Sequence, residues 1–430
     1  MVLHRRAFAN ALLSLLLLTV FSAVSPTVAQ DDLGGLTLQQ VRDAYGITPL
    51  LDRGIDGSGQ NVAIVTGGNY GQSDVEFFAA HYQLPTPTVE HILAPASPEL
   101  PAAEWTMDVE IVLALAPRAT ILVYDGFNIL DPTVLAGKTP SVLSAIIEQG
   151  RANIITMSYD KCEFALSDNQ AKSLQKLTEQ IHAAGITFFK GAGDGGAYWC
   201  AHDQANPDPD RLAVGAVSSD PYVTAVGGTT LTLADGLYAS ESAWSSPADR
   251  RGTGGGISSR WTIPDYQRNY LLSDENPTGM RQVPDVSADA DINSGFPFYC
   301  TVADSTCQGW QLTRGNSAAG PLWAGGTALV NQYLAEHLDD LPGAPIQVHG
   351  PEDFYWLAAA YAGGEVAHAP FHDVAAGDNL YYKARSGYDL TTGLGTPDFY
   401  AIALDLEQLY RAQAATATAE PATATAEAGN

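Results

Sequence analysis

Basic residues are scarce in this chain. The 430 residues include 21 lysines and arginines against 48 aspartates and glutamates, which gives a net charge of −27 at neutral pH. Phosphate groups would repel such a surface, so nucleic acid and anionic membranes are excluded as partners. Acidic conditions would protonate many carboxylates and relieve the self-repulsion. The composition therefore suits an acidic environment.

Long apolar runs are almost absent too. The one exception is ALLSLLLLTVFSAV (11–24), which follows Arg5 and Arg6 and precedes the small residues Thr27 and Ala29. This pattern is typical of a secretory signal peptide cleaved near Ala29. A permanent membrane anchor is the alternative. No other stretch is long and apolar enough to span a bilayer. We expect a secreted protein with no membrane association after cleavage.

Cysteines are few. Four cysteines in an exported protein allow two disulfides. Cys300 and Cys307 are close enough in sequence to close a hairpin, and Cys162 would then pair with Cys200. Spacing alone does not prove this connectivity.

Short apolar strands alternate with helical segments along the first half of the chain. This alternation predicts an α/β fold with a mostly parallel sheet, and it places functional groups at the carboxyl ends of the strands. The expected strands are NVAIVTGG (61–68), ATILVYDG (119–126), ANIITMSY (152–159) and ITFFKGAGDGG (186–196).

The expected domain boundaries follow from composition. We expect residues 1–29 to form the signal peptide and residues 30–408 to form a single folded domain. The middle part of this domain, about 200–300, should hold strands and long loops. The segment 409–430 contains ATATAE twice. Such low complexity predicts a disordered tail.

Histidine is missing where serine chemistry usually needs it. None of the nine histidines lies in an HGTH-type context, and the TGG turn after the first strand lacks the aspartate of an Asp-His-Ser protease. Yet Ser317, in RGNSAAGPLWAGG (314–326), follows a glycine turn at the start of a helix. Unpaired N–H groups there suit a nucleophile with an oxyanion site. Plain N-capping is the alternative.

Two carboxylates interrupt an apolar helix in AAEWTMDVEIVLALAPRATILVYDG (102–126). Glu104 and Asp108 are one turn apart, on one face. Burying two carboxylates together is costly. They form either a solvated stripe at the edge of the core or a general acid/base pair.

Together these segments resemble the sedolisin family of serine-carboxyl peptidases, which place a Ser-Glu-Asp triad on a subtilisin-like, three-layer α/β fold. The resemblance runs from LTLQQVRDAYGI (36–47) to about Leu404. Its motifs, in family order, are EWTMDVE, ITMSYDKCE, GAGDGG, GGGIS, VPDVSADAD, RGNSAAGP, FHDV and SGYDLTTGLGTPD.

The resemblance implies a role for each catalytic residue. Ser317 would attack the scissile carbonyl, Glu104 would act as its base, and Asp108 would orient Glu104. Asp194 would line the oxyanion hole as a protonated acid. Because carboxyl groups titrate near about pH 4, this set would work only in acid, about pH 3–5.

The resemblance also implies one structural calcium ion. Its carboxylate ligands would be Asp373 and Asp389, and its carbonyl ligands Val374, Arg385 and Gly387, with water completing the oxygen shell. Two unrelated surface turns are the alternative, because EF-hand spacing is absent.

The chain departs from the family pattern at four places. Asn316 replaces threonine, Arg314 replaces a small or apolar residue, and Asp160 replaces a glycine beside the expected cleft, which affects the substrate residues accepted. The segment between Ala29 and residue 36 leaves no room for the family's pro-domain. We expect a pro-domain-free member, held inactive by neutral pH or assisted by a separate inhibitor or chaperone chain.

The sequence thus predicts a secreted, monomeric endopeptidase for peptides or unfolded proteins. A tripeptidyl-type exopeptidase is one alternative, since it shares the triad and differs in cleft closure. A non-catalytic binding protein on the same scaffold is the other.

Overall fold

The computed structural model describes residues 33–93, 102–126, 132–135, 141–202, 208–270, 279–302 and 307–419. The expected signal peptide lies outside these ranges. The α-helices are α1 (Leu38–Ala44), α2 (Thr48–Leu51), α3 (Gln72–His81), α4 (Ala103–Leu115), α5 (Pro132–Leu135), α6 (Val142–Gln149), α7 (Asp168–Ala183), α8 (Asp265–Tyr270), α9 (Asn316–His337), α10 (Gly350–Ala362) and α11 (Phe399–Ala419). None of them has both the length and the apolar character that crossing a membrane requires.

The strands fall into one large sheet and several short ribbons. They are β1 (Asn61–Thr66), β2 (Thr88–Leu93), β3 (Thr120–Asp125), β4 (Ile154–Met157), β5 (Thr187–Gly191), β6 (Thr224–Ala234), β7 (Leu237–Ala243), β8 (Ser245–Ser246), β9 (Arg251–Gly252), β10 (Gly256–Thr262), β11 (Met280–Val283), β12 (Val286–Asp289), β13 (Pro297–Cys300), β14 (Gly309–Leu312), β15 (Phe371–His372) and β16 (Thr396–Pro397).

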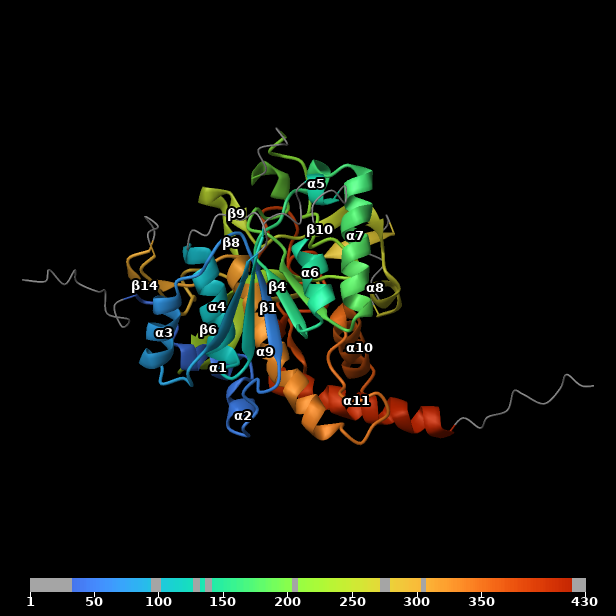
Figure 1. Cartoon of the computed structure of the whole chain (residues 1–430). Helices are drawn as coiled ribbons and strands as arrows, with labels where there is room; N and C mark the ends of the chain where they lie inside the picture. The colour runs from blue at the N-terminus through green and yellow to red at the C-terminus, as the bar shows by residue number, and fades with distance from the viewer. Residues whose placement is uncertain are drawn as a thin grey trace, which may run out of the picture.

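The central sheet has the order β12-β6-β5-β4-β1-β3-β2, and every neighbouring pair on this path is parallel. Figure 1 shows β1 and β4 of this sheet at the centre of the molecule. Only β7 runs antiparallel, beside β6. The predicted α/β fold with a mostly parallel sheet is therefore confirmed. Order reverses around β1, where a parallel sheet opens a crevice at the carboxyl ends of its strands.

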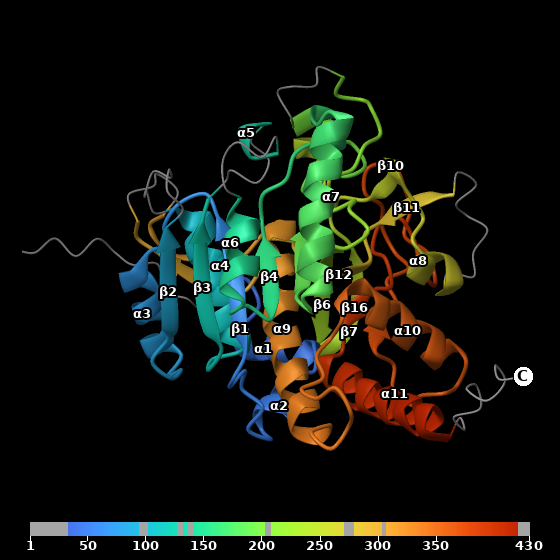
Figure 2. The same ribbon diagram turned by 45° about the vertical axis from the view of Figure 1, so that its right-hand side comes forward.

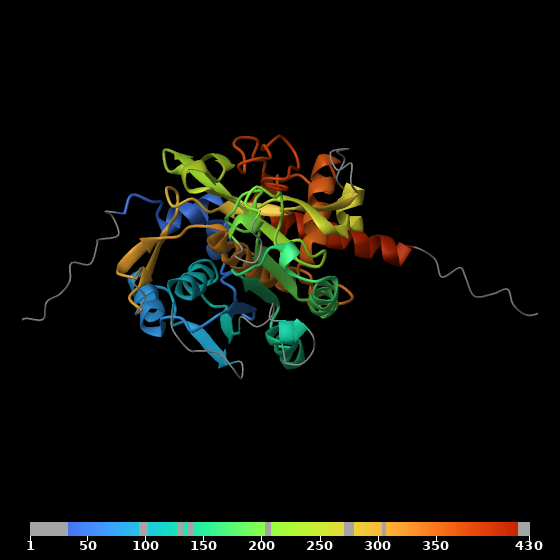
Figure 3. The same cartoon turned by 90° about the horizontal axis from the view of Figure 1, so that it is seen from above.

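Alternating side chains of the strands separate two hydrophobic cores. In β1, Val62 and Ile64 join the core that contains α4 and α9, while Ala63 and Val65 join the core under α6 and α7. The period of two residues sends successive side chains to opposite faces. Figure 2 shows α6 and α7 in front of the sheet and α9 behind it, and Figure 3 shows helices on both sides from above. The result is a three-layer fold.

Helix α9 passes across the strands β1, β4, β5, β6 and β12. Its first turn lies against the end of β5, where Gly191 permits the approach. A Cβ on Gly191 would stand 2.5 Å from the carbonyl oxygen of Asn316. The lack of a side chain at Gly191 therefore allows the helix that bears Ser317 to lie close to the end of β5.

The middle of the chain belongs to the same domain. Strand β12 lies within the 200–300 region and pairs with β6 in the central sheet. Just before it, Arg281 forms a buried, two-pronged ion pair with Asp285, at 2.8 Å for Nη1–Oδ1 and 2.6 Å for Nη2–Oδ2. The two disulfides join Cys162 to Cys200 and Cys300 to Cys307, as the spacing suggested.

The C-terminal segment differs from the expectation. Helix α11 continues to Ala419, so 409–419 is helical, not a disordered tail. Leu406 and Leu409 anchor the helix in the core, and the alanines that follow are strong helix formers that extend it. Residues 420–430 lie outside the described ranges.

Candidate active site

Helix α4 carries both carboxylates of the EWTMD motif. Its apolar residues are buried nearly all round. Asp108 is 0 % exposed, and Glu104, in the first turn, is half-buried. A solvated stripe would expose both groups, so that alternative does not describe this helix. Asp108 therefore lies inside the molecule and Glu104 at its edge, on the helix that packs along α9.

Ser317 is the second residue of α9. The N-cap is Gly315, with φ of +76°, which has no side chain to cap the helix. Ser317 is therefore not a capping residue. The N–H of Asn316 donates to Asp194 Oδ1 at 2.8 Å, and a Cβ on Gly315 would stand 2.6 Å from Asp194 Oδ2. Thus Asp194 lies directly beside the positive end of the helix that holds Ser317.

Ser158 connects the two helices. It follows β4, and its hydroxyl donates to Asp108 Oδ2 at 2.8 Å while lying 3.4 Å from the carbonyl oxygen of Ser317. That carbonyl has no helical partner because the residue four positions on is Pro321, which lacks an N–H. One hydroxyl therefore spans from the aspartate to the backbone of the serine.

The electrostatics of the pair follow from burial. Loss of hydration raises the pKa of Glu104, a hydrogen bond with the Ser317 side chain lowers it, and the nearby Asp194 raises it. Burial and then the charge of Glu104 raise the pKa of Asp108 well above its usual range, and the bond from Ser158 lowers it. Two carboxyl groups so close together resist double ionisation, because each negative charge raises the pKa of the other group.

The chain resembles known proteins in sequence and in fold. No protein-family model matches the chain. It is 29% identical to kumamolisin of Bacillus sp. (strain MN-32) over 363 residues, which are 80% of the chain and 59% of kumamolisin. It is also 29% identical to sedolisin of Pseudomonas sp. (strain 101) over 307 residues, 69% of the chain and 47% of sedolisin. The chain is thus similar in sequence to peptidases of the sedolisin family.

A solved structure of a family member supports the same fold. The structure of Pseudomonas sedolisin, a serine-carboxyl proteinase complexed with two molecules of pseudo-iodotyrostatin, has a TM-score of 0.68 and 24% identity, over 88% of this chain and 99% of that one. More distant relatives in sequence include tripeptidyl-peptidases. The chain spans only 59% and 47% of the two bacterial relatives named above.

The candidate site also contains a lysine that our sequence reasoning missed. Lys190, in β5, is 1 % exposed, and its Nζ donates to the carbonyl of Gly191 at 2.6 Å. Burial lowers the pKa of Lys190, whereas four carboxylates raise it. These are Asp160, Asp194, Glu104 and Asp108. In return the ammonium lowers the pKa of both Glu104 and Asp108. A lysine inside the apolar run ITFFK was the signal in the sequence.

The departures from the family motifs have structural roles. Asp160 is buried and accepts N–H bonds from Lys161, Val217 and Ser218 at 2.8–3.1 Å, so its carboxylate fastens a turn. Asn316 is fully buried and donates to the carbonyl of Val226 in β6 at 3.4 Å. Neither carboxylate nor amide is directed into open solvent.

The two segments expected to bind calcium lie together. The Asp373 carboxylate accepts the N–H of Gly387 at 3.1 Å, and Asp389 Oδ2 accepts that of Arg385 at 2.7 Å, so both hold one turn. The carbonyl of Val374 accepts a side-chain hydroxyl at 3.2 Å. Asp389 and Arg385 also line a cavity of about 360 Å³. The candidate ligand atoms are carboxylate and carbonyl oxygens, which are the atoms that Ca²⁺ prefers.

Proposed function

We propose that this chain is a secreted serine-carboxyl endopeptidase that hydrolyses peptide bonds at acidic pH. One relation carries the proposal: the Ser317 side chain lies next to the carboxyl of Glu104 and lowers the pKa of that carboxyl. A nucleophile in contact with a base, and a third group next to the base, is the arrangement of a catalytic triad. Sequence similarity to kumamolisin and sedolisin supports it.

In the proposed mechanism Glu104 takes the proton of Ser317 as its oxygen attacks the scissile carbonyl, and later returns the proton to the leaving amine. Asp108, held by Ser158, orients Glu104 and keeps a proton on the pair. Asp194 lies beside the N–H of Asn316, at the helix end where the oxyanion would develop. The proposed mechanism needs no histidine.

The pH dependence follows from the coupled pair. Activity requires one proton to leave the Glu104–Asp108 pair, so it falls at low pH. It also requires that the second proton remains, so it falls again as pH rises. Desolvation raises the pKa of Glu104. The midpoint of the low-pH limb should therefore lie at a higher pH than the pKa of a free glutamate. The profile is bell-shaped.

Calcium belongs to the same proposal. Asp373, Asp389 and the carbonyls of Val374, Arg385 and Gly387 would hold one structural ion. When bound, the ion would supply positive charge that ties the two C-terminal loops together. It takes no part in the proton transfers.

Digestion of an unfolded protein from about pH 3 to about pH 8 tests the proposal. We expect acid-only activity that Ser317→Ala and Glu104→Gln abolish. Glu110→Gln is the matched control, because Glu110 is also buried in α4 but accepts the N–H of Tyr299 at 2.7 Å. A neutral optimum, or an active Ser317→Ala variant with an intact near-ultraviolet circular dichroism spectrum, would refute the mechanism.

The tripeptidyl-peptidases among the relatives favour a second candidate, release of tripeptides from a free N-terminus. A peptide blocked at its N-terminus separates the two. An endopeptidase cleaves it, whereas an exopeptidase of this type needs the free amine.

A further inference from the structure

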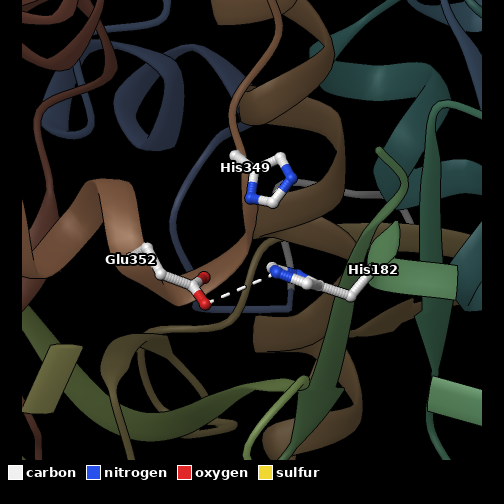
Figure 4. A group of neighbouring side chains, drawn as sticks. All are labelled: His182, His349 and Glu352. Atoms are coloured by element: carbon white, nitrogen blue, oxygen red, sulfur yellow. Dashed lines mark ion pairs between the residues drawn. The ribbon is translucent and has the colours of Figure 1, made fainter. Parts of the chain in front are cut away.

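Three side chains with metal-binding atoms meet away from the candidate active site. His182 lies in the last turn of α7, His349 precedes the first turn of α10, and Glu352 lies within that turn (Figure 4). One ligand atom of each lies within 4.8 Å of the others. In the described ranges this is the only group of three or more His, Cys, Asp and Glu side chains placed so closely.

The distances suit a shared ion better than direct bonds. His182 Nε2 lies 3.6 Å from Glu352 Oε1, which is too long for a hydrogen bond. Two ligands about 2.0–2.1 Å from a tetrahedral zinc ion stand about 3.4 Å apart. The rings of His182 and His349 have centroids 4.3 Å apart and an interplanar angle of 74°. The three side chains point toward one another in Figure 4.

The Glu352 side chain is 36% exposed, but one of its carboxyl oxygens is enclosed. Glu352 Oε2 is buried and has no hydrogen-bond partner in the described part of the chain. A buried carboxyl oxygen without a partner is costly, and a divalent cation would compensate it.

The backbone around the cluster is held in place. The N–H of His349 donates to Asp353 Oδ2 at 2.7 Å, and the hydroxyl of Tyr410 donates to the same oxygen at 2.7 Å. Gly350, with φ of +62°, lies so close that a Cβ there would stand 3.3 Å from His182 Nδ1. Glycine at this position therefore gives the His182 ring room beside α10.

We propose that His182, His349 and Glu352 form a zinc site whose fourth position is open to water. Two imidazoles and one carboxylate suit Zn²⁺, whereas Ca²⁺ prefers an all-oxygen shell. A cavity of about 610 Å³, lined in part by His349 and Glu352, gives an ion access. The bound ion would tie the end of α7 to the start of α10, independently of the proposed peptidase activity.

Titration calorimetry with ZnCl₂ on the untagged full chain tests this, near pH 7 and with excess Ca²⁺ to fill the proposed calcium site. We expect one zinc ion per chain, and affinity reduced more than about tenfold in His182→Gln and in Glu352→Gln. His368→Gln is the matched control, because it removes a histidine paired with a carboxylate elsewhere, at 2.7 Å from Asp405. Its zinc binding should equal that of the parent chain.

Unchanged zinc affinity in Glu352→Gln, or an equal loss in His368→Gln, would overturn the proposal. Circular dichroism of the metal-free variants identifies any that fail to fold. His349→Gln then decides the matter, because His349 is exposed and its replacement spares the core. A folded His349→Gln chain that binds zinc as tightly as its parent also refutes the site.

Discussion

Gly191→Ala tests whether one strand end positions the nucleophile. The added Cβ would lie 2.5 Å from the carbonyl oxygen of Asn316 and 2.9 Å from its carbon, and both atoms belong to backbone. A relaxed carbon–oxygen contact is about 3.3 Å or longer, so β5 and the first turn of α9 must separate by about 0.8 Å. Ser317, the next residue, moves with that turn.

The size of the effect follows from this displacement. Overpacking of this kind destabilises a protein by about 1–3 kcal/mol, which leaves a domain of ordinary stability folded. Misplacing a reacting group by about 1 Å costs up to about a hundredfold in rate. We therefore expect kcat on a peptide substrate to fall by about ten- to a hundredfold, with a modestly lower Tm.

Gly320→Ala provides the matched control on the same helix. Its Cβ would approach Thr156 Oγ1 no closer than 3.3 Å, so the backbone need not move. Alanine also favours the helix by about 1 kcal/mol over glycine. Activity near that of the parent chain is expected. If folded Gly191→Ala kept kcat within about threefold, contact with β5 would not determine the position of Ser317.

Three further perturbations have defined outcomes. Lys190→Met removes a charge that lowers the pKa of Glu104, so the low-pH limb of kcat/KM should move to higher pH; a limb that stays in place or moves the other way contradicts the role of the lysine. Arg281→Met leaves the charge of Asp285 buried and unpaired, and should lower the free energy of unfolding in urea by about 3–5 kcal/mol. A loss below about 1 kcal/mol would show that Asp285 is compensated in another way. Calcium at a hundredfold excess over its Kd should stabilise the chain by about 2.7 kcal/mol, and Asp389→Asn should remove that gain; equal stabilisation of both chains would place the ion elsewhere.

Local patterns predicted the framework of the molecule well. Apolar, β-branched runs at 61–66, 120–125 and 154–157 became parallel strands because their side chains are buried on both faces of the sheet. The same logic predicted that Glu104 and Asp108 share a helix face. Their meeting with Ser317 came from the family resemblance, since nothing in the spacing relates residues some two hundred positions apart.

What escaped sequence reasoning depends on long-range packing. Lys190 reads as an interruption of an apolar strand until the fold brings carboxylates from three other segments around it. The zinc cluster joins the end of α7 to a turn beyond 340. Low complexity predicted disorder from 409, but burial of Leu409 against the core extends order along α11.

The passage of α9 across five strands has a consequence for maturation. Ser317 and its partners come from α4, β4, β5 and α9, so the reactive constellation exists only when both layers have closed on the sheet. Under the proposed function, a chain whose core is still loose has no competent nucleophile. Newly made chains are most easily cleaved before they fold, and at that stage they cannot yet cleave one another. A reagent that labels the active-site serine would therefore react only with fully folded molecules.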